Sequence, residues 1–405
     1  MEKIYAEMKN SDVEWIGDIP TTWDTKHLFQ VAIQVKNKNS KLLEKNLLSL
    51  SYGKIKRKNI ETSEGLLPAS FDNYNIVEKD DIVLRLTDLQ NDHTSLRVGK
   101  VEEKGIITSA YVSVRPVLGV SKYIYYALHS FDLKKGFYGM GSGVRQGLNF
   151  TEAKMIRIPF PELPEQAAIA AYLDEKCGAI DEIIEQAKAS IEEYKAWKSS
   201  VIFEAVTKGL NPNAEMKESG VEWIGNVPKH WQTLKFKYII NIESGDAIRN
   251  ELLTDDGLYP VYGGGEKIGY ADSYNVSNNT ILVGRVGARC GCVTRVIDKA
   301  WATDNALVIT SIANYDYLYY LLHAANLNRL NTSNAQPLIT ATKINNHFTA
   351  YTPNTDEQQK IVDYLDEKCA TIDGIIAEKE ALIADMEAYK KSLIFETVTG
   401  KRKVC

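Results

Sequence analysis

The sequence predicts an α+β protein: two mixed α/β globular domains separated by a long antiparallel two-helix coiled coil, with a pseudo-two-fold internal duplication. Three observations support this prediction. The hexapeptide YLDEKC occurs at 172–177 and again at 364–369. A second pair of matching segments lies upstream, and a heptad period runs through both downstream segments. At 405 residues the chain is also longer than one hydrophobic core usually serves.

The upstream repeat opens each copy of the duplication. SDVEWIGDIPTTW at 11–23 corresponds to SGVEWIGNVPKHW at 219–231, an offset of 208 residues. The downstream repeat has an offset of 192 residues, so the two copies share their borders and differ in the sequence between them. This is the pattern of a duplicated segment of about two hundred residues with divergent inserts.

The downstream segments predict two long helices that pack on each other. Mostly apolar positions advance by alternating steps of four and three over 173–205 and again over 365–397, with three lysines among them, which is a heptad seam. Each helix runs about forty residues, or roughly 60 Å at 1.5 Å per residue. The second insert follows the first helix directly, so helix 1 carries the chain away from the first insert and helix 2 carries it back. Antiparallel pairing follows, with two unrelated surface helices as the alternative.

The inserts predict mixed α/β domains made mainly of strands. β-branched, alternating segments indicate strands, and tyrosine-rich segments of helical period occupy equivalent places in both inserts. The predicted strands are 80–86, 110–117, 279–287 and 305–312, and the predicted helices are 121–130 and 314–327. The predicted boundaries are 1–160 for the first domain, 161–210 for the first spacer helix, 211–353 for the second domain and 354–405 for the second spacer helix.

Charge is distributed unevenly along a chain whose net charge is −5. Residues 20–160 contain 21 basic and 14 acidic side chains, and residues 228–353 contain 11 and 10. The helical segments 162–205 and 355–400 contain 4 against 10 and 5 against 11. Acidity is therefore confined to the helices, and the basic first insert is free to meet a polyanion. The acidic helix faces are left for protein partners, with mere solvation as the alternative.

Composition and motifs favour a recognition protein over an enzyme. The chain has no apolar run of membrane-spanning length, and its N-terminus is too polar for a secretory signal, so we expect a cytoplasmic location. It contains no nucleotide-phosphate motif, no metal-ligand spacing and no Asn-Pro-Pro-aromatic box for holding a flipped adenine. GMGSG at 139–143 is more typical of a flexible loop than of a phosphate cradle. No catalytic residue, metal or cofactor is expected in this chain.

Two unlike domains held apart by a spacer suit double-stranded DNA. Half-sites on one face of the duplex recur about every 34 Å, so each domain can meet a short stretch while the base pairs between are skipped. Because the inserts differ in sequence, the two half-sites should differ as well.

These paired segments resemble the specificity subunit of type I restriction-modification systems. Each insert opens with VEWIG followed by Pro and Trp, at 13–23 and 221–231, and closes with LPEQAAIAAYLDEK at 163–176 or DEQQKIVDYLDEK at 356–368. YPVYGGGEKIGY, ILVGRVGARCG and WATDNALVI resemble one target-recognition-domain pattern. LLSLSYGKIKRKN, DDIVLRLTDLQ and SAYVSVRP resemble another. The resemblance spans the whole chain.

The resemblance implies a non-catalytic subunit whose two inserts are target recognition domains, each reading one half of an asymmetric bipartite DNA site. It implies that the helices bind two modification subunits, which are adenine methyltransferases that carry S-adenosylmethionine. Two restriction subunits, a nuclease and translocase that uses ATP with Mg, can join them in this family. The second insert departs from the pattern in having little net positive charge, so its hold on phosphates is expected to rely on the first domain or on partners.

Base-reading residues are expected in glycine-rich or strand-end loops, where forked donors pair with guanine and amides with adenine. The candidates in the first domain are Lys56, Arg57, Arg85, Thr87, Arg97, Ser109, Tyr111, Arg145 and Gln146. The candidates in the second domain are Tyr262, Tyr270, Arg285, Arg289, Asp304, Asn305 and Gln336. A structural or phosphate-positioning role is the alternative for each. For the whole chain the alternative is a duplicated coiled-coil adaptor whose globular ends bind proteins.

Overall fold

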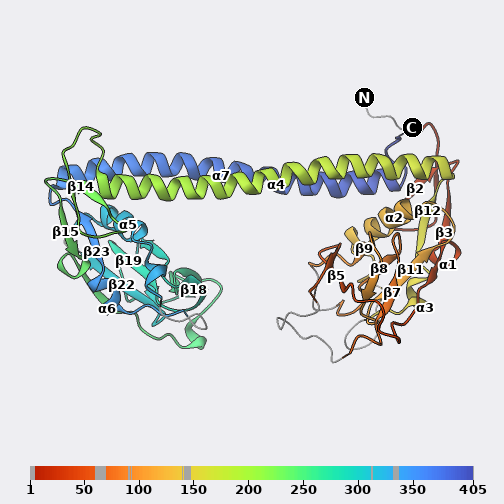
Figure 1. The fold of residues 1–405 in the computed structure, drawn as a ribbon, viewed down its shortest axis with the longest axis horizontal. Helices are drawn as coiled ribbons and strands as arrows, with labels where there is room; N and C mark the ends of the chain where they lie inside the picture. The colour runs from red at the N-terminus through yellow and green to blue at the C-terminus, as the bar shows by residue number, and fades with distance from the viewer. Residues whose placement is uncertain are drawn as a thin grey trace. The chain divides into compact units, whose positions relative to one another are not determined.

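The structure is a computed structural model that describes residues 5–59, 70–89, 92, 94–138, 140, 147–311, 313–331 and 337–404. The chain divides into two compact units. The first unit comprises residues 1–187 and 381–405, and the second comprises residues 188–380. Figure 1 draws their helices and strands and labels many of them. Within the described ranges, no helix is both long and apolar enough to cross a membrane.

The first unit is built from short strands and helices around one central sheet. Its strands are β1 (Met8–Asn10), β2 (Asp18–Pro20), β3 (Asp24–His27), β4 (Ala32–Gln34), β5 (Leu48–Ser51), β6 (Lys54–Arg57), β7 (Asn75–Val77), β8 (Ile82–Leu84), β9 (Val98–Lys100), β10 (Gly105–Ile107), β11 (Val112–Pro116) and β12 (Arg157–Phe160). Its short helices are α1 (Leu28–Val31), α2 (Ser121–Leu133) and α3 (Phe150–Ala153). The central sheet has the order β4-β11-β8-β9, and every neighbouring pair is antiparallel.

The second unit repeats this plan. Its strands are β13 (Met216–Glu218), β14 (Asn226–Pro228), β15 (Gln232–Lys235), β16 (Ile240–Ser244), β17 (Tyr259–Gly263), β18 (Glu266–Ala271), β19 (Thr280–Gly284), β20 (Val293–Val296), β21 (Trp301–Ala302), β22 (Ala306–Ser311) and β23 (Phe348–Tyr351). Its helices are the 3-10 turns η1 (Phe236–Tyr238), η2 (Asn250–Leu252), η3 (Gly287–Arg289) and η4 (Leu327–Leu330), with α5 (Tyr315–Ala324) and α6 (Ala341–Asn346). The central sheet has the order β16-β22-β19-β20, again antiparallel throughout.

The two central sheets therefore have the same strand order and direction. Their inner strands, β8 and β19, are buried along their length. Alternate residues of each strand belong to two different apolar clusters, so both faces are covered. A strand covered in this way reads as a continuous apolar run, which is why IVL and TILVG were recognisable in the sequence. Helices α2 and α5 lie at equivalent places against these sheets. The predicted α+β fold with its internal duplication is confirmed.

Two long helices, α4 (Leu163–Lys208) and α7 (Thr355–Val398), pair within each unit (Figure 1). In the first unit, Leu173 near the start of α4 shares a buried cluster with Leu393 near the end of α7. In the second unit, Leu365 near the start of α7 shares a buried cluster with Ile202 near the end of α4. The start of one helix thus meets the end of the other in both units, and the predicted antiparallel heptad seam is confirmed.

Lysines within the seam extend to its edge, as their long stems allow. Lys390 Nζ lies 2.6 Å from Asp181 Oδ1 in the first unit. Lys198 Nζ lies 2.6 Å from Asp373 Oδ2 in the second unit. The two ion pairs are related by the offset of 192 residues in both partners, so the same contact is made twice.

Duplicated polar contacts attach each globular domain to the helices. Tyr126 of α2 donates to Asp174 of α4 at 2.8 Å, and Tyr320 of α5 donates to Asp366 of α7 at 2.6 Å. A buried glutamine in the first turn of each long helix satisfies the backbone beside it in the same way. These glutamines are Gln166 and Gln358.

The C-terminal ends of the long helices rest on the repeated tryptophan segments at 11–23 and 219–231. Gly400 after α7 has φ +71°, and a Cβ there would lie 2.3 Å from Pro20 Cδ. Gly209 after α4 has φ +72° and lies against the buried Trp231. A left-handed glycine closes a helix without steric cost, and here its missing side chain also admits the neighbouring ring.

Candidate nucleic-acid interface

In the first unit three of the candidates, Arg85, Thr87 and Arg97, belong to the loop that follows β8, residues 85–97, which we call the β8–β9 loop. The chain returns to the end of β8 at Leu148, whose backbone N–H donates to the Leu86 carbonyl at 2.8 Å. Arg85 and Thr87 therefore lie beside the point where the glycine-rich segment ends. Irregular backbone at the end of a buried strand is a common place for binding side chains, because the rigid sheet positions them.

Arg97 was predicted to contact DNA, but its side chain lies inside the protein. It is fully buried, and its guanidinium donates all five of its N–H groups within the protein. The acceptors are the Tyr138 hydroxyl and the carbonyls of Arg85, Thr87, Asp88 and Asp92. Buried carbonyls of a loop need donors, and a guanidinium supplies five in a fixed fork. Arg97 therefore shapes the β8–β9 loop and has no donor left for DNA.

Asp92 holds Arg85 at the surface of this loop. The Asp92 carboxylate accepts from the Ser95 backbone N–H at 2.9 Å. Chiefly through this hydrogen bond, the pKa of Asp92 lies well below its usual range, so the group stays ionised. Arg85 Nη1 lies 3.4 Å from Asp92 Oδ2, and the Arg85 side chain is 28% exposed. Arg85 is thus oriented by a fixed charge and still reaches solvent.

The remaining described candidates of the first unit lie on other segments. Lys56 and Arg57 are exposed on β6, where Arg57 forms a bidentate ion pair with Glu103. Ser109 is exposed in the turn after β10, and Tyr111 is half-buried against the small apolar cluster beneath the β5–β6 hairpin. Since a surface ion pair contributes little, Arg57 can exchange Glu103 for a phosphate at low cost.

Tyr52 is a residue that the sequence reasoning missed. It is 74% exposed in the turn of the β5–β6 hairpin and has φ +47°, in the left-handed region that few non-glycine residues adopt. A Cβ at the adjoining Gly53 would lie 3.0 Å from Leu96 Cβ, so the turn packs on the β8–β9 loop. The signal was available, because Tyr-Gly stands between the two alternating segments LSLS and KIKR, as a tight hairpin turn would.

In the second unit the candidates gather around the loop that follows β19, residues 285–292, which we call the β19–β20 loop. The Arg285 N–H donates to the Asn305 carbonyl at 2.9 Å. The Arg285 carbonyl accepts from the Ile339 N–H at 2.9 Å, and the Gly287 N–H donates to the Pro337 carbonyl at 3.1 Å. Arg285 and Asn305 are thus brought together with the chain that returns at Pro337.

Close glycine packing shapes this second loop. A Cβ at Gly284 would lie 2.2 Å from the carbonyl oxygens of both Arg289 and Gly264. Gly264 belongs to the turn between β17 and β18, so that turn rests directly on the loop backbone. Arg289 is exposed at the surface and pairs with Glu266 at 2.9 Å.

The other candidates of the second unit differ in exposure. Tyr262 is half-buried against an apolar cluster, and its carbonyl accepts from the Thr303 N–H at 2.9 Å. Tyr270 accepts a hydrogen bond from Lys267 Nζ at 2.8 Å. Asp304 is exposed in the turn before β22, next to Asn305. Of this group, Asp304 adjoins the residue that contacts the β19–β20 loop, since the Asn305 carbonyl accepts from the Arg285 N–H.

Three candidates, Arg145, Gln146 and Gln336, lie outside the described residues. Their described neighbours, Gly147 and Pro337, enter the two units at matching places. The chain after Gly147 bonds to Leu86, and the chain after Pro337 bonds to Arg285.

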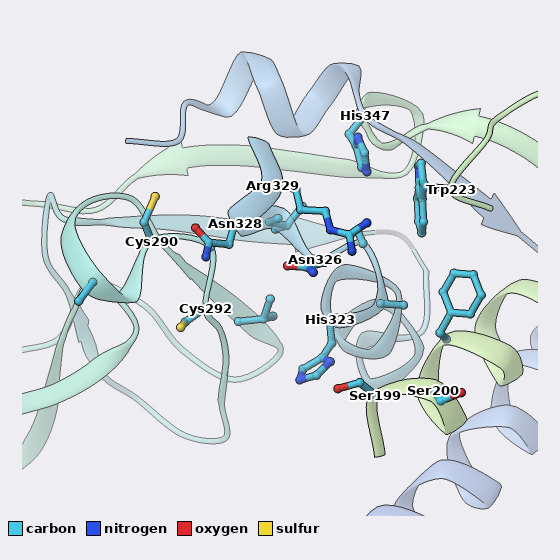
Figure 2. A pocket seen from close by; sticks show the side chains of 17 residues that line it. Ser199, Ser200, Trp223, Cys290, Cys292, His323, Asn326, Asn328, Arg329 and His347 are labelled. Atoms are coloured by element: carbon cyan, nitrogen blue, oxygen red, sulfur yellow. The ribbon is translucent and has the colours of Figure 1, made fainter. Parts of the chain in front are cut away.

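A cavity of about 720 Å³ lies in the second unit between the end of α4 and the β19–β20 loop. Figure 2 shows Trp223 and His347 facing each other, and their rings stack at 5.2 Å and 11°. Trp223 Nε1 and His347 Nε2 are buried with no hydrogen-bond partner among the described residues. Burial lowers the pKa of His347, which favours the neutral ring. The lining therefore offers stacking surface and unused polar atoms.

The first unit has a cleft of about 1000 Å³ at the corresponding place, with Trp15 and Phe395 where the second unit has Trp223 and Phe203. Its rim is more basic, with Lys134, Lys135, Arg157 and Lys401. Neither site brings ligands together for a metal: in the ranges that the structure describes, no three His, Cys, Asp or Glu side chains are close enough to hold one.

Comparison with known proteins gives a consistent result. The Type I restriction modification DNA specificity domain matches residues 20–193 and 228–383. The chain is 32% identical over 123 residues to the type I restriction enzyme EcoprrI specificity subunit of Escherichia coli, a match that spans 30% of each protein. It is 22% identical over 437 residues to the MjaVIII specificity subunit of Methanocaldococcus jannaschii, covering 95% of this chain and 94% of that protein.

A solved structure concerned with complex assembly and conformational transition of the type I R-M system contains a chain of similar fold. The TM-score is 0.68 with 13% identity, over 94% of this chain and 98% of that one. At this identity the similarity bears on the fold alone.

Proposed function

The chain belongs to the type I restriction modification DNA specificity family, and from that premise we propose how its two units divide the reading of DNA. It is a specificity subunit with a role in DNA sequence recognition. We propose that each unit reads one half of an asymmetric bipartite site and that the chain performs no bond chemistry. The supporting observation is that the β8–β9 and β19–β20 loops leave matching strands of matching sheets and present different side chains.

In the first unit, the proposed base contacts come from Arg85 and Thr87 of the β8–β9 loop, with Tyr52 beside them. A guanidinium pairs with the acceptor edge of guanine, and a hydroxyl pairs with several bases. The proposed phosphate and sugar contacts are Lys56, Arg57, Ser109 and Tyr111, with Arg145 and Gln146 also proposed to contact DNA. Arg97 acts as a positioning residue beneath them.

In the second unit, the proposed base contacts are Arg285, Arg289 and Asn305, since an amide pairs with adenine. Asp304 is proposed to accept from a cytosine amino group. Tyr262, Tyr270 and Gln336 complete the proposed set. The near-neutral charge of this unit predicts that its grip depends more on base contacts than on phosphates.

The proposed partners follow from the family and from the acidic helices. We propose that two adenine methyltransferase subunits dock on α4 and α7, supply S-adenosylmethionine and modify one adenine in each half-site. Restriction subunits that use ATP and Mg are proposed as further partners. The duplicated helix contacts support two equivalent docking places, one in each unit.

Methylation mapping tests this proposal. The chain is co-expressed with its methyltransferase subunit, and methylated adenines are mapped across a genome. We expect marks at a discontinuous, asymmetric site, and exchange of residues 24–160 for another insert should change one half only. Marks at one contiguous palindrome, or a change in both halves together, would contradict the proposal.

Single substitutions sharpen the test. Arg85→Ala should relax the base preference in one half-site and Arg285→Ala in the other, each lowering methylation of the intact site by about 10–100-fold, as loss of one base-reading pair predicts. Arg57→Ala is the control, because loss of a phosphate contact should weaken binding to all sequences alike and reduce the salt dependence.

A further inference from the structure

The cavity of the second unit (Figure 2) lies between the end of α4, the tryptophan segment at 219–231, the β19–β20 loop and the corner where α5 meets η4. None of the described residues that line it is acidic, and Arg329 is the one lining residue with a permanent positive charge. Burial lowers the pKa of His323 and of His347, which favours the neutral ring of each. The described lining therefore carries one positive charge and no negative charge.

Arg329 has a fixed backbone and an unused side chain. Its backbone N–H donates to the Asn326 carbonyl at 3.0 Å. Gly291 of the β19–β20 loop packs closely on the same turn, because a Cβ there would lie 2.5 Å from the backbone nitrogen of Asn328. The guanidinium has no ion-pair or hydrogen-bond partner among the described residues, and Figure 2 shows it directed toward Trp223. A positive group that is already positioned binds an anion at a lower entropic cost.

The tryptophan of this cavity differs from its counterpart in the first unit. There, Trp15 Nε1 donates to the Arg157 carbonyl at 3.1 Å, and the Phe131 ring packs on Trp15 edge to face at 5.3 Å. Helices α2 and α5 begin 194 residues apart, at 121 and 315, so Ala325 stands where the first unit has Phe131. The Trp223 N–H is buried without a hydrogen-bond partner in the described part of the chain. The second unit thus keeps the indole ring and leaves its donor available.

The chemistry of the lining selects a singly charged aromatic acid as the ligand. A guanidinium binds a carboxylate through two parallel hydrogen bonds, and the indole N–H adds a third donor. Phe203, Val293 and the buried Leu327 supply apolar surface for a ring. The volume of about 720 Å³ lies within the range of about 300–1000 Å³ that small-molecule sites have. A nucleotide fits less well, because its phosphate carries about two negative charges and its ribose hydroxyls would meet this apolar wall.

We propose that this cavity binds a small aromatic carboxylate, with the carboxylate on Arg329 and the Trp223 N–H and the ring against Phe203. Residues 288–293 of the β19–β20 loop form one wall of the cavity, so the bound acid should also stabilise the conformation of that loop. This second step rests on the proposed function, because the loop is the one proposed to read the second half-site.

Isothermal titration calorimetry of the full chain tests the binding site, with phenylacetate and indole-3-acetate as probes. We expect one bound probe per chain. Arg329→Gln should weaken binding by about 10–100-fold through loss of the charged pair, and Trp223→Phe, which keeps a ring but removes the N–H, by about 3–10-fold. Ala325→Phe, which copies the first unit, should block the cavity. Arg249→Gln is the matched control, since Arg249 is an exposed arginine of the same unit outside the cavity, and it should leave the affinity unchanged.

Thermal unfolding of each variant distinguishes lost binding from lost folding. Absence of binding of both probes to the wild type at about 1 mM, or equal affinity of the wild type, Arg329→Gln and Trp223→Phe, would overturn the site. Tighter binding of adenosine monophosphate than of either acid would overturn the ligand class. If Arg329→Gln instead lowers the affinity for all DNA sequences and reduces its salt dependence, with probe binding unchanged, Arg329 contacts a DNA phosphate and the inference is wrong.

Hydrogen exchange with and without the probe tests the effect on the loop. Protection of residues 285–292 should rise with the probe in the wild type and not in Arg329→Gln, and unchanged exchange in the wild type would contradict the coupling. Methylation mapping is a separate measurement. A chain that binds no probe but directs methylation to an asymmetric site loses this inference and keeps the proposed function. A chain that binds the probe but directs methylation to one palindrome loses the proposed function and keeps the cavity site.

Discussion

The β8–β9 loop and the β19–β20 loop follow equivalent strands of equivalent sheets, yet different interactions stabilise their conformations. In the first, the buried guanidinium of Arg97 gathers the loop carbonyls. In the second, backbone rests directly on backbone at Gly284 and Gly291, where a Cβ would come within 2.2 and 2.5 Å of its neighbours. A large polar side chain stabilises the first loop. Close packing of backbone on backbone, which the missing Cβ of glycine permits, stabilises the second.

This difference shows how little of each loop the duplicated scaffold dictates. The sheet fixes the two ends of each loop, which are joined by the hydrogen bond from the Arg85 N–H to the Arg97 carbonyl in one unit and from the Gly284 N–H to the Cys292 carbonyl in the other. Between those ends, any loop that satisfies its own buried backbone is compatible with the fold. The reading surfaces can therefore diverge while the helices and sheets stay the same.

Arg97→Met should break the first loop and leave the second intact. Removal of the guanidinium leaves its carbonyl partners without donors and takes away a cation that stabilises the ionised form of the buried Asp132, so we expect the free energy of unfolding of the first unit to fall by about 3–5 kcal/mol. Urea unfolding followed by hydrogen-exchange mass spectrometry resolves the units. Peptides of α2 should lose protection and those of α5 should not.

Arg57→Met is the control for this prediction, because Arg57 lies at the surface and should matter by less than about 0.5 kcal/mol. Equal effects of the two substitutions would show that the buried guanidinium does not hold the loop.

The two units should also differ in their response to acid. His129 of α2 and His323 of α5 occupy equivalent positions, and burial lowers the pKa of both, that of His129 to about 4. A lowered histidine pKa contributes stability that is lost as the pH falls from about 6.5 to 4. Burial also raises the pKa of Asp132 to about 6, which contributes stability that is lost as the pH rises from about 4 to 6. The two shifts oppose each other in the first unit.

Asp132→Asn should therefore expose the histidine effect. Without the carboxyl, the first unit should lose about 3 kcal/mol between pH 6.5 and 4, at about 1.4 kcal/mol per pKa unit. His129→Gln should reverse the slope, so that stability falls as the pH rises. In the second unit, Asn326 stands where the first has Asp132, and stability should decline with acid in the wild type already. Urea unfolding followed by hydrogen-exchange mass spectrometry at each pH, corrected for the intrinsic exchange rate, measures the stability of each unit. Equal dependence of stability on pH in the two variants would contradict the assignment.

Gly284→Ala should break the second loop for steric reasons alone. Its φ is not positive, so the expected cost of about 1–3 kcal/mol comes from the new Cβ meeting the Arg289 and Gly264 carbonyls. Gly287→Ala in the same loop is the matched control: it has open space around it but φ +72°, and should cost roughly 1 kcal/mol through backbone strain. Thermal unfolding compares the two variants. A larger loss of stability for Gly287→Ala would show that the backbone contact at Gly284 can relax at low cost.

The scaffold could be predicted from the sequence because its signals are periodic and repeated. The steps of four and three residues that include Leu173, Cys177 and Ile180 indicate a helix with one buried seam. The same steps in the second copy support this interpretation independently. Strands β8 and β19 were recognisable because both faces are covered and their apolar runs are unbroken. In each case the pattern depends on neighbours in the chain or on the other copy.

The candidate site was harder to predict because its contacts join distant residues of irregular segments. Arginine is rarely buried, so residue type alone placed Arg97 at the surface. The partner of Arg57 is Glu103, 46 residues away, and no local pattern indicates it. Tyr52 was overlooked although its hairpin turn was visible. Residue type can suggest which groups contact DNA, but only the fold shows which donors are already in use.

The duplicated ion pairs give the smallest expected effect and the strictest comparison of the units. Double-mutant cycles on Lys198 and Asp373, and on Lys390 and Asp181, should each give a coupling of about 0.5 kcal/mol, because all four side chains are partly exposed, and the coupling should weaken with salt.

The coupling energies of the two pairs should not be identical. Lys54 lies 4.0 Å from Asp181 and has no counterpart at Asp373 among the described residues. Asp181→Asn should therefore cost slightly more than Asp373→Asn in urea unfolding, and Lys54→Met should remove that difference. A large coupling in only one unit would mean that the helix pairing is duplicated in geometry but not in energy.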